Sequence, residues 1–394
     1  MVLGEIIGGS GIFVDGDWIE SKDQNPAGDV RLIQLADIGA GDFTDKSNRY
    51  ITSNKATELN CTFLKKGDIL IARLGDPLCK ACMFPLDGKY ITAVDVAIFR
   101  TDRQDISRKY LVYLLNSPWF KGQIKKYESG TTRKRISRKN LNKIELPIPP
   151  LPEQERIVAR IEELFSQLDS GVETLKKTKE QLAVYRQTVL KEAFDNLECE
   201  LVSIQSVCSN IVDCPHSTPQ WVDDGYLCLR TTNFKRGYLD LTERNYVSKE
   251  TFVKRNVRLI PQPGDVLYSR EGAILGIACI IPEDLSVCLG QRMMLLRTNN
   301  QMDGRFLMHY LNSPTVTAFV TSITGGSASP HVNVGDIKNF LIPKPSRSEQ
   351  NKKLDEIENK LSVCDSIEKT VDVALQQAEV MRQSILKKAF EGEI

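Results

Sequence analysis

The sequence predicts an α+β protein built as a pseudo-twofold tandem repeat, in which two mixed α/β globular domains are separated by two long, antiparallel coiled-coil helices. Three observations lead to this prediction: the first half of the chain matches the second, each half ends in a heptad pattern, and short strand-like runs precede each pattern. We expect globular domains at residues 1–145 and 197–341, and spacer helices at residues 146–196 and 342–394.

The repeat is carried by motifs that recur at a constant distance of 196 positions, which is close to half of the 394 residues. A shared register without gaps over a long stretch indicates duplication of a whole unit. The matched motifs are Leu-Asn-Ser-Pro (residues 115–118 and 311–314), a Pro-rich run ending in Glu-Gln (147–154 and 343–350), and Leu-Lys-Glu/Lys-Ala-Phe (190–194 and 386–390).

A heptad pattern follows each Pro-rich run. Proline is excluded from helix interiors, so each helix should start just after the run. Steps of four and three residues separate the seam positions, as in a coiled coil. The predicted seam of the first helix is Ile157, Ile161, Leu164, Leu168, Gly171, Leu175, Thr178, Leu182, Tyr185 and Val189. That of the second is Ile357, Cys364, Ile367, Val371, Ala374, Ala378, Met381 and Ile385.

Neither helix can leave its apolar stripe in water. About 40 residues make a rod of roughly 60 Å, which would overhang a single domain. A surface helix folded back on its own domain is therefore the weaker alternative. We expect the two helices to cover each other in antiparallel orientation.

The globular sequences favour a compact mixed domain over a doubly wound sheet. Strand-like runs at residues 30–35, 68–72 and 93–99 are broken by turn signals, and a helical run at 110–115 stops at Asn-Ser-Pro. The Gly-rich residues 8–11 lack the Lys-Ser/Thr of a phosphate-binding P-loop, so we interpret them as an ordinary loop.

Composition limits the possible partners and compartment. Lys plus Arg total 52 against 51 Asp plus Glu, so any nucleic-acid surface must be local. The longest apolar run, residues 273–281, is too short to cross a bilayer, and the N-terminus lacks the pattern of a signal peptide. Ten cysteines without disulfide spacing favour a reduced, cytoplasmic protein with no membrane partner.

Basic residues are densest between the helical run and the first Pro-rich run, where Glu128 is the only acid within the cluster. The turn at residues 129–132 supplies amides and hydroxyls directly before Arg133, a combination suited to a phosphate backbone. A solvated basic face is the alternative. Candidate DNA-binding residues here are Lys125, Thr131, Thr132, Arg133, Lys134 and Arg135, joined by Arg73 from an earlier strand end.

The second repeat has no basic run in the matching window. Its candidate DNA-binding residues are Arg230, Thr232, Asn233, Lys235, Arg236, Arg270, Ser327, Ser329 and His331, with Arg270 matching Arg73 at a distance of 197. One scaffold with two different contact surfaces indicates two different targets.

Motifs for catalysis or metal binding are weak, and we predict no catalytic and no metal-ligating residues. Cys79 and Cys82 form a lone Cys-x-x-Cys, and Cys208, Cys214 and His216 lack a fourth ligand. The Asn-Ser-Pro-Trp run is only faintly similar to the Asn-Pro-Pro-aromatic motif of amino-methyltransferases, and a helix stop explains it. Walker A and dinucleotide-binding motifs are missing from the sequence.

Taken together, the Pro-rich entries, the long helices ending in Ala-Phe, the paired Leu-Asn-Ser-Pro and residues 229–234 (Leu-Arg-Thr-Thr-Asn-Phe) resemble the DNA specificity (S) subunits of Type I restriction-modification systems. The resemblance covers nearly the whole chain. Matching residues 33–38 to 229–234 places Gln34 opposite Arg230 and adds it to the candidates.

This resemblance implies two target recognition domains that each read one half of a bipartite, asymmetric double-stranded DNA sequence, with the helices as a ruler between them. It implies modification (methyltransferase) subunits that clamp the helices and restriction (translocase/endonuclease) subunits. Cofactors are expected on those partners alone, namely S-adenosylmethionine, ATP and magnesium. The rival interpretations are a restriction enzyme with its own chemistry and a coiled-coil scaffold that binds only proteins.

Overall fold

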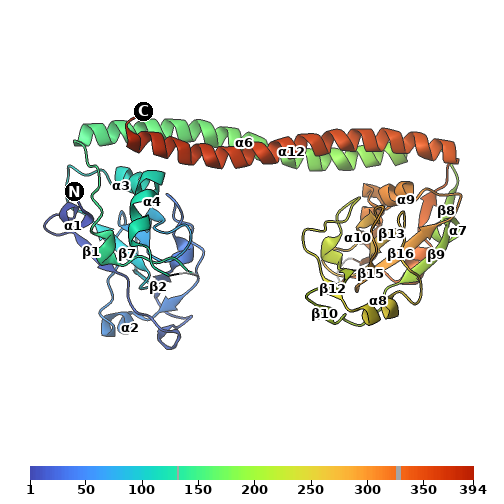
Figure 1. Ribbon diagram of the computed structural model, residues 1–394, viewed down its shortest axis with the longest axis horizontal. Helices are drawn as coiled ribbons and strands as arrows, with labels where there is room; N and C mark the ends of the chain where they lie inside the picture. Colours follow the sequence, from blue (N-terminus) through green and yellow to red (C-terminus); the bar gives the residue numbers. More distant parts are fainter. Residues whose placement is uncertain (131–132, 325–329) are drawn as a thin grey trace. The chain divides into compact units, whose positions relative to one another are not determined.

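The computed structural model describes residues 1–130, 133–324 and 330–394. The chain divides into two compact units, in which unit 1 comprises Met1–Leu175 with Val373–Ile394 and unit 2 comprises Lys176–Asp372. The division passes through both long helices, α6 (Leu151–Asp195) and α12 (Arg347–Glu391). Each unit therefore holds one globular part and one segment of each helix (Figure 1).

Unit 1 is built on two small sheets. The first is antiparallel with the order β1 (Ile12–Asp15), β7 (Val96–Arg100), β4 (Ile69–Ala72), β5 (Ala81–Met83). The second has the order β3 (Tyr50–Ile51), β2 (Val30–Ile33), β6 (Tyr90–Thr92), with β2 and β6 parallel. The helices are α1 (Leu3–Ile6), α2 (Ser53–Glu58), α3 (Arg108–Asn116), α4 (Pro118–Ile124) and α5 (Arg138–Leu141); the 3-10 turns are η1 (Ser21–Asp23), η2 (Leu35–Asp37) and η3 (Lys125–Tyr127).

Unit 2 repeats this design, with the same strand order in its antiparallel sheet and one more strand in its second sheet. Its antiparallel sheet runs β9 (Cys208–Asp213), β16 (Met293–Thr298), β13 (Val266–Ser269), β14 (Ala278–Ile280). Its second sheet runs β10 (Trp221–Val222), β12 (Tyr246–Val247), β11 (Tyr226–Leu229), β15 (Cys288–Leu289), and β8 (Leu201–Ser203) pairs with β17 (Leu341–Pro343). The remaining elements are α7 (Ile204–Val207), η4 (Thr231–Asn233), α8 (Lys249–Arg255), α9 (Gly304–Leu311), α10 (Pro314–Thr324) and α11 (Val334–Lys338).

The predicted α+β tandem fold is confirmed by these matched sheets. The expected strands at residues 30–35, 68–72 and 93–99 correspond to β2, β4 and β7, and the expected helix to α3. Strand β1 was missed, because it is short and is defined by a distant partner, pairing with β7 from Ile12 opposite Arg100 to Asp15 opposite Ala97. No helix in the described ranges is long and apolar enough to cross a bilayer.

Within each unit the segments of α6 and α12 run antiparallel. In unit 1 the Arg382 guanidinium pairs with Asp169 and lies 4.6 Å from the centre of the Phe165 ring. In unit 2 Lys179 pairs with Asp372 at 2.7 Å and Arg186 pairs with Asp365 at 2.7 Å. Figure 1 shows the paired segments side by side in each unit.

The predicted seam is correct in part. Ile157, Ile161, Leu182 and Val189 on α6 are buried, as are Ile357, Cys364, Val371 and Ala378 on α12. Four predicted seam residues are exposed and are corrected here: Gly171, Tyr185, Ile367 and Met381. The next residue along the helix is less exposed at each of these places: Val172, Arg186, Glu368 and Arg382.

Salt bridges explain this shift at Arg186, Glu368 and Arg382. Arg186 pairs with Glu368 at 2.9 Å, so at this level two charged side chains lie between the helices. The sequence pattern assigns apolar residues to the seam and therefore selected Tyr185 and Ile367, which face outward.

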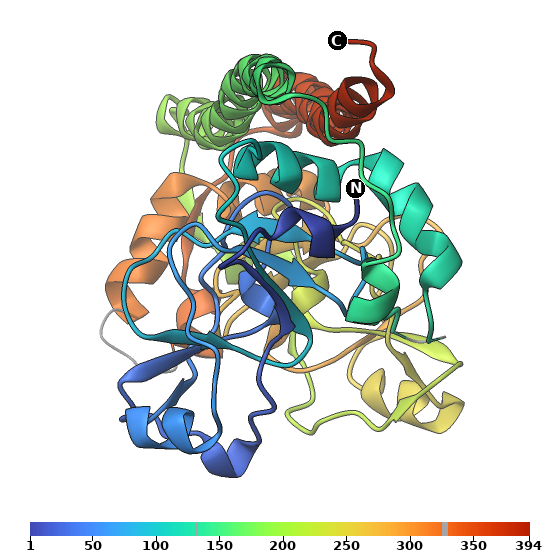
Figure 2. The same ribbon diagram turned by 90° about the vertical axis from the view of Figure 1, so that its left-hand side faces the viewer.

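The recurring Ala-Phe motif joins each helix end to a globular part. Phe390 packs edge-on against Tyr110 of α3 with ring centres 5.3 Å apart, and Phe194 packs in the same way against Phe306 of α9 at 5.3 Å. Figure 2 shows α3 between the helix pair and the first sheet of unit 1. The helices thus form part of the hydrophobic core of each unit.

The glutamine of each Glu-Gln motif is fully buried and ties the helix start to the loop before α3 or α9. Gln154 accepts from the Ser107 amide at 2.9 Å and donates to the Asp105 carbonyl at 3.0 Å and the Pro149 carbonyl at 2.7 Å. Gln350 makes the equivalent three hydrogen bonds in unit 2.

Gln154→Ala should lower the free energy of unfolding of unit 1 by about 2 to 3 kcal/mol, because buried backbone groups lose their partners. The measurement is urea-induced unfolding of the full chain. Gln167→Ala, an exposed glutamine on the same helix, is the matched control and should leave the transition unchanged. Equal stability of the two variants would contradict this role of Gln154.

Candidate nucleic-acid interface

Three loops gather at one end of the first sheet of unit 1. They are the turn loop (residues 34–37), the hairpin loop between β4 and β5 (residues 74–80) and the basic loop (residues 129–135). Together, the hairpin and basic loops and the start of the turn loop line a cavity of about 480 Å³, with Leu35, Pro77, Lys80, Arg133 and Lys134 among its residues. Four of the predicted site residues, Gln34, Arg73, Arg133 and Lys134, lie in this cavity or next to it in the chain.

Backbone hydrogen bonds fix the hairpin and basic loops against each other. The Gly75 amide donates to the Lys134 carbonyl at 3.0 Å, and the Ile136 amide donates to the Arg73 carbonyl at 3.0 Å. Ser129 and Arg135 exchange backbone bonds at 2.9 and 2.8 Å, which closes the basic loop. Thr131 and Thr132 lie outside the described residues.

Arg73 is only 5% exposed and stabilises the loops from inside. Its guanidinium donates to the Ile136 and Val94 carbonyls and pairs with Asp15 at 3.1 Å. Its counterpart Arg270, 6% exposed, pairs with Asp213 at 2.9 Å and Glu271 at 2.7 Å. The structure therefore places both residues behind the surface, and a direct DNA contact by either stays an untested prediction.

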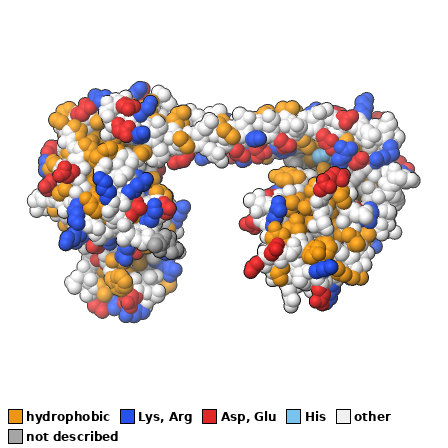
Figure 3. Space-filling model, viewed as in Figure 1, with side chains coloured by type: hydrophobic (Ala, Val, Ile, Leu, Met, Phe, Trp, Pro, Cys, Tyr) orange, Lys and Arg blue, Asp and Glu red, His pale blue; other side chains and the backbone are white. Residues whose placement is uncertain are grey.

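Acidic residues pair with the basic cluster, two of them from distant parts of the chain. Arg135 pairs with Asp95 at 2.8 Å, Lys134 with Glu128 at 3.4 Å and Arg138 with Asp15 at 3.4 Å. Few acids lie within the basic cluster along the sequence, as expected. The expectation is wrong for the folded structure, in which acidic side chains pair with the cluster. Figure 3 shows the result, with basic, acidic and apolar side chains interspersed on the visible face of each unit.

Lys121 also leaves the surface, because its amine donates to the Leu78 and Cys79 carbonyls at 2.6 and 2.7 Å. Burial lowers the pKa of Lys121 to about 8 and raises the pKa of the Cys79 and Cys82 thiols to about 12. Lys121 thus holds the hairpin loop, and the two thiols stay protonated. Lys125 and Arg133 remain exposed.

Unit 2 builds the same set of loops. Glu271 bridges to His331, as Leu74 does to Arg135, and the Val332 amide donates to the Arg270 carbonyl at 2.9 Å. His331 is exposed at this position. Ser327 and Ser329 lie outside the described residues.

The candidates around η4 have different roles. Asn233 is buried; its amide donates to the Asp240 and Glu243 carbonyls, and its oxygen accepts from the Arg230 amide. Gln34 begins the matching turn in unit 1, where the buried Asp37 carboxylate takes the Asn233 position and accepts from the Gln34 amide at 2.7 Å. The asparagine therefore shapes the turn and presents no free amide.

Exposed groups remain on the unit 2 surface beside this turn. Arg230 lies with its guanidinium 5.8 Å from the centre of the Trp221 ring, Thr232 is exposed, and Lys235 is 3.9 Å from Asp240. Arg236 turns toward α10, donating to the Asn312 carbonyl and the Thr317 hydroxyl, and burial lowers the pKa of its guanidinium. Arg230, Thr232 and Lys235 are thus the groups of this turn that are available to a ligand.

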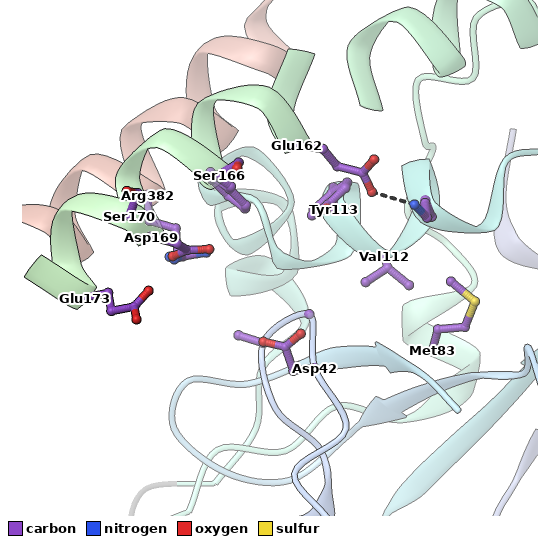
Figure 4. A pocket seen from close by; sticks show the side chains of 14 residues that line it. Asp42, Met83, Val112, Tyr113, Glu162, Ser166, Asp169, Ser170, Glu173 and Arg382 are labelled. Carbon is purple, nitrogen blue, oxygen red and sulfur yellow. Dashed lines mark hydrogen bonds and ion pairs between the residues drawn. The ribbon is translucent and has the colours of Figure 1, made fainter. Parts of the chain in front are cut away.

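A second cavity of unit 1, of about 660 Å³, lies between α3 and the helix pair (Figure 4). Two ion pairs lie in its wall, Lys109 with Glu162 at 2.6 Å and Arg382 with Asp169. Unit 2 has a matched cavity of about 680 Å³ with the equivalent pair Arg305 and Glu358 at 3.1 Å.

These paired cavities belong to the join between each globular part and the helices. The hydrogen bond from His309 and the nearby Arg305 lower the pKa of Glu358, which keeps this carboxylate ionised. Among the residues that the structure describes, no group of three or more Cys, His, Asp or Glu side chains is arranged to hold a metal ion.

Two globular repeats with one strand order, each presenting the same set of loops and packed on the same helix pair, define a class of duplicated recognition proteins. The family model described as Type I restriction modification DNA specificity domain matches residues 10–183 and 220–377. The chain belongs to this family, which confirms the resemblance seen in the sequence.

Curated relatives include specificity subunits of Type I restriction enzymes. That of EcoBI from Escherichia coli is 28% identical over 305 residues, covering 70% of this chain and 64% of the relative. That of EcoKI from Escherichia coli strain K12 is 23% identical over 304 residues, covering 72% and 65%. The chain thus spans less than two thirds of the length of these relatives.

Solved structures share the fold. A chain from "Structural basis underlying complex assembly and conformational transition of the type I R-M system" matches with a TM-score of 0.69 at 20% identity, covering 100% of this chain and 97% of the other. The HsdS subunit from Thermoanaerobacter tengcongensis matches with a TM-score of 0.50 at 18% identity, covering 98% of each chain.

Arg133→Ala should reduce the slope of log affinity for DNA against log salt by about one, because a lost phosphate contact releases one counterion fewer. Arg133 is exposed and makes no ion pair within the described ranges. Lys66→Ala, at the other end of β4, is the control and should keep the slope. An unchanged slope in Arg133→Ala would show that Arg133 makes no phosphate contact, and would favour the interpretation of the basic loop as a solvated face.

Proposed function

We propose that the chain is the sequence-specific, non-catalytic DNA specificity subunit of a Type I restriction-modification complex. Each globular repeat reads one half of a bipartite, asymmetric double-stranded target. Helices α6 and α12 set the spacing of the halves and dock the methyltransferase subunits. The observation that carries the proposal is that both units present the same set of loops on the same antiparallel sheet, but with different side chains on those loops.

Two globular repeats that each bind DNA weakly can together bind a two-part target with high specificity. Each half-site offers few contacts, and tethering makes the second encounter intramolecular. A helix of 45 residues is about 68 Å long, which is close to two turns of DNA at roughly 34 Å each. Both helices have this length, so the spacing depends on two matched rods.

Exposed apolar side chains on the helices support a docking role. On α6, Val184 and Tyr185 are 68% and 48% exposed and line a shallow groove, while Val363 and Ile367 are exposed on α12 in the same unit. Neighbouring exposed apolar side chains, such as Val184 and Tyr185, suit a partner surface. We propose modification subunits there, which carry S-adenosylmethionine, with restriction subunits that use ATP and magnesium joining through them.

Adenine methylation across a host genome tests this function directly. With the chain and its active modification subunits, single-molecule sequencing should show one two-part motif that disappears when the chain is deleted. Replacing residues 1–145 with the matching part of a relative should change one half of the motif and keep the other. Methylation that is unaffected by deletion would favour a protein-binding scaffold.

A further inference from the structure

In the hairpin loop of unit 1 (residues 74–80), backbone hydrogen bonds hold the shape of the loop, which we call the frame. The side chains of Asp76, Pro77 and Lys80, which are exposed or line the cavity, are called the tip. The ends of the loop are closed by the Ala72 amide bound to the Lys80 carbonyl at 2.8 Å and the Cys79 amide bound to the Ala72 carbonyl at 2.9 Å. Leu78 and Cys79 are buried, and the Lys121 amine donates hydrogen bonds to both of their carbonyls. The rest of the loop has little freedom, so the direction of its tip side chains is set.

Unit 2 has the same frame at residues 271–277. The Ser269 amide donates to the Ile277 carbonyl at 2.9 Å, and the Gly276 amide donates to the Ser269 carbonyl at 2.9 Å. The Gly272 amide donates to the Pro330 carbonyl at 3.0 Å, as Gly75 does to Lys134.

Backbone angles extend the match between the two loops. Gly75 and Gly272 both have positive φ, at 131° and 82°. Cys79 has φ 56° where Gly276 has φ 79°, so the chain keeps a left-handed position that costs a non-glycine residue energy. Conservation of the frame at this cost indicates that the loop shape matters in both repeats.

The tips differ completely in chemistry. In unit 1 the exposed Asp76 is followed by Pro77, and Lys80 lines the cavity. The matched residues in unit 2 are Ala273, which is exposed, and Ile274 and Ile277, which are partly buried and pack against the core of unit 2. Within the described residues Asp76 and Lys80 take part in no ion pair, so both charged groups are available to a ligand.

The charge of the Asp76 carboxylate favours contact with the bases over contact with the phosphates. An aspartate among the basic loop residues is repelled by phosphates, so it adds nothing to backbone binding. Base edges in the major groove offer amino donors: cytosine N4 suits a carboxylate, and guanine O6 and N7 suit a lysine. An exposed alanine offers instead an apolar contact for the thymine methyl group.

We propose that the two hairpin loops are the base-reading elements of the two repeats. Asp76 and Lys80 read a G·C pair in the first half-site by hydrogen bonds, and the exposed Ala273 contacts a thymine methyl in the second. The proposal rests on the proposed function and goes further by assigning sequence choice to these positions.

The test is methylation of a plasmid library with both half-sites randomised, using the full chain with its methyltransferase subunits. Asp76→Ala with Lys80→Ile gives the unit 1 loop an apolar tip. Preference at one or two positions of the first half-site should fall by about 5- to 100-fold, the range expected for a specific base contact. The second half-site and the spacer should stay the same.

Lys66→Ile with Asp87→Ala is the matched control, because this exposed pair lies at the opposite end of the same hairpin. It should leave both half-sites unchanged. Ala273→Asp is the reciprocal variant and should alter only the second half-site. An unaltered first half-site, or an equal loss at all positions, in Asp76→Ala with Lys80→Ile would overturn the proposal.

Two further results separate failure of the proposal from other failures. If the double variant methylates nothing, Asp76→Asn and Lys80→Arg are measured singly; a shifted preference supports the proposal and an unchanged motif in both overturns it. If the unaltered chain directs no two-part motif, the proposed function itself is wrong.

Discussion

The packing of α6 against α12 is the interaction on which the rest of the structure depends. Neither helix can leave its apolar stripe in water, and the segments that pair within each unit also complete its globular core. Phe390 contacts Tyr110 in unit 1, and Phe194 contacts Phe306 in unit 2. Unit 1 therefore needs residues from both ends of the chain, whereas unit 2 is the continuous segment between them, and each unit depends on segments of both helices.

Much of this architecture could be predicted from sequence because duplication repeats the same structural requirements. Gln154 and Gln350 recur because each satisfies three backbone groups, and Asn116 and Asn312 recur because each binds both the amide and the carbonyl of a strand residue, Ala81 or Ala278. The exact seam could not be predicted. Ion pairs such as Arg186 with Glu368 take positions that an apolar pattern assigns elsewhere.

The candidate site was harder to predict, because its charges are balanced by residues far away in sequence. Asp15 and Asp95 reach basic residues more than 35 positions distant, so a run of basic residues overstates the free positive surface. The hairpin loop could not be predicted for the opposite reason. Its tip carries one acid and one base without any motif, and it is distinguished only by its difference from the matching loop of the other repeat.

The frames and tips separate two tasks. Buried groups such as Arg73 and Lys121 fix loop shape, while exposed side chains on the loops supply contacts that can change without disturbing the core. A specificity protein benefits from this division, since a new target needs only new tip residues. The same division explains how two repeats with one strand order can present different chemistry.

The central claim, that the helix pair spaces two independent readers, is tested by deleting one heptad of seven residues from each helix, 172–178 and 373–379. This shortens each rod by about 10 Å while keeping the antiparallel register. The measurement is the methylated motif of the shortened chain with its modification subunits. The account predicts an altered spacer or lost methylation, and an unchanged motif with the original spacer would contradict it.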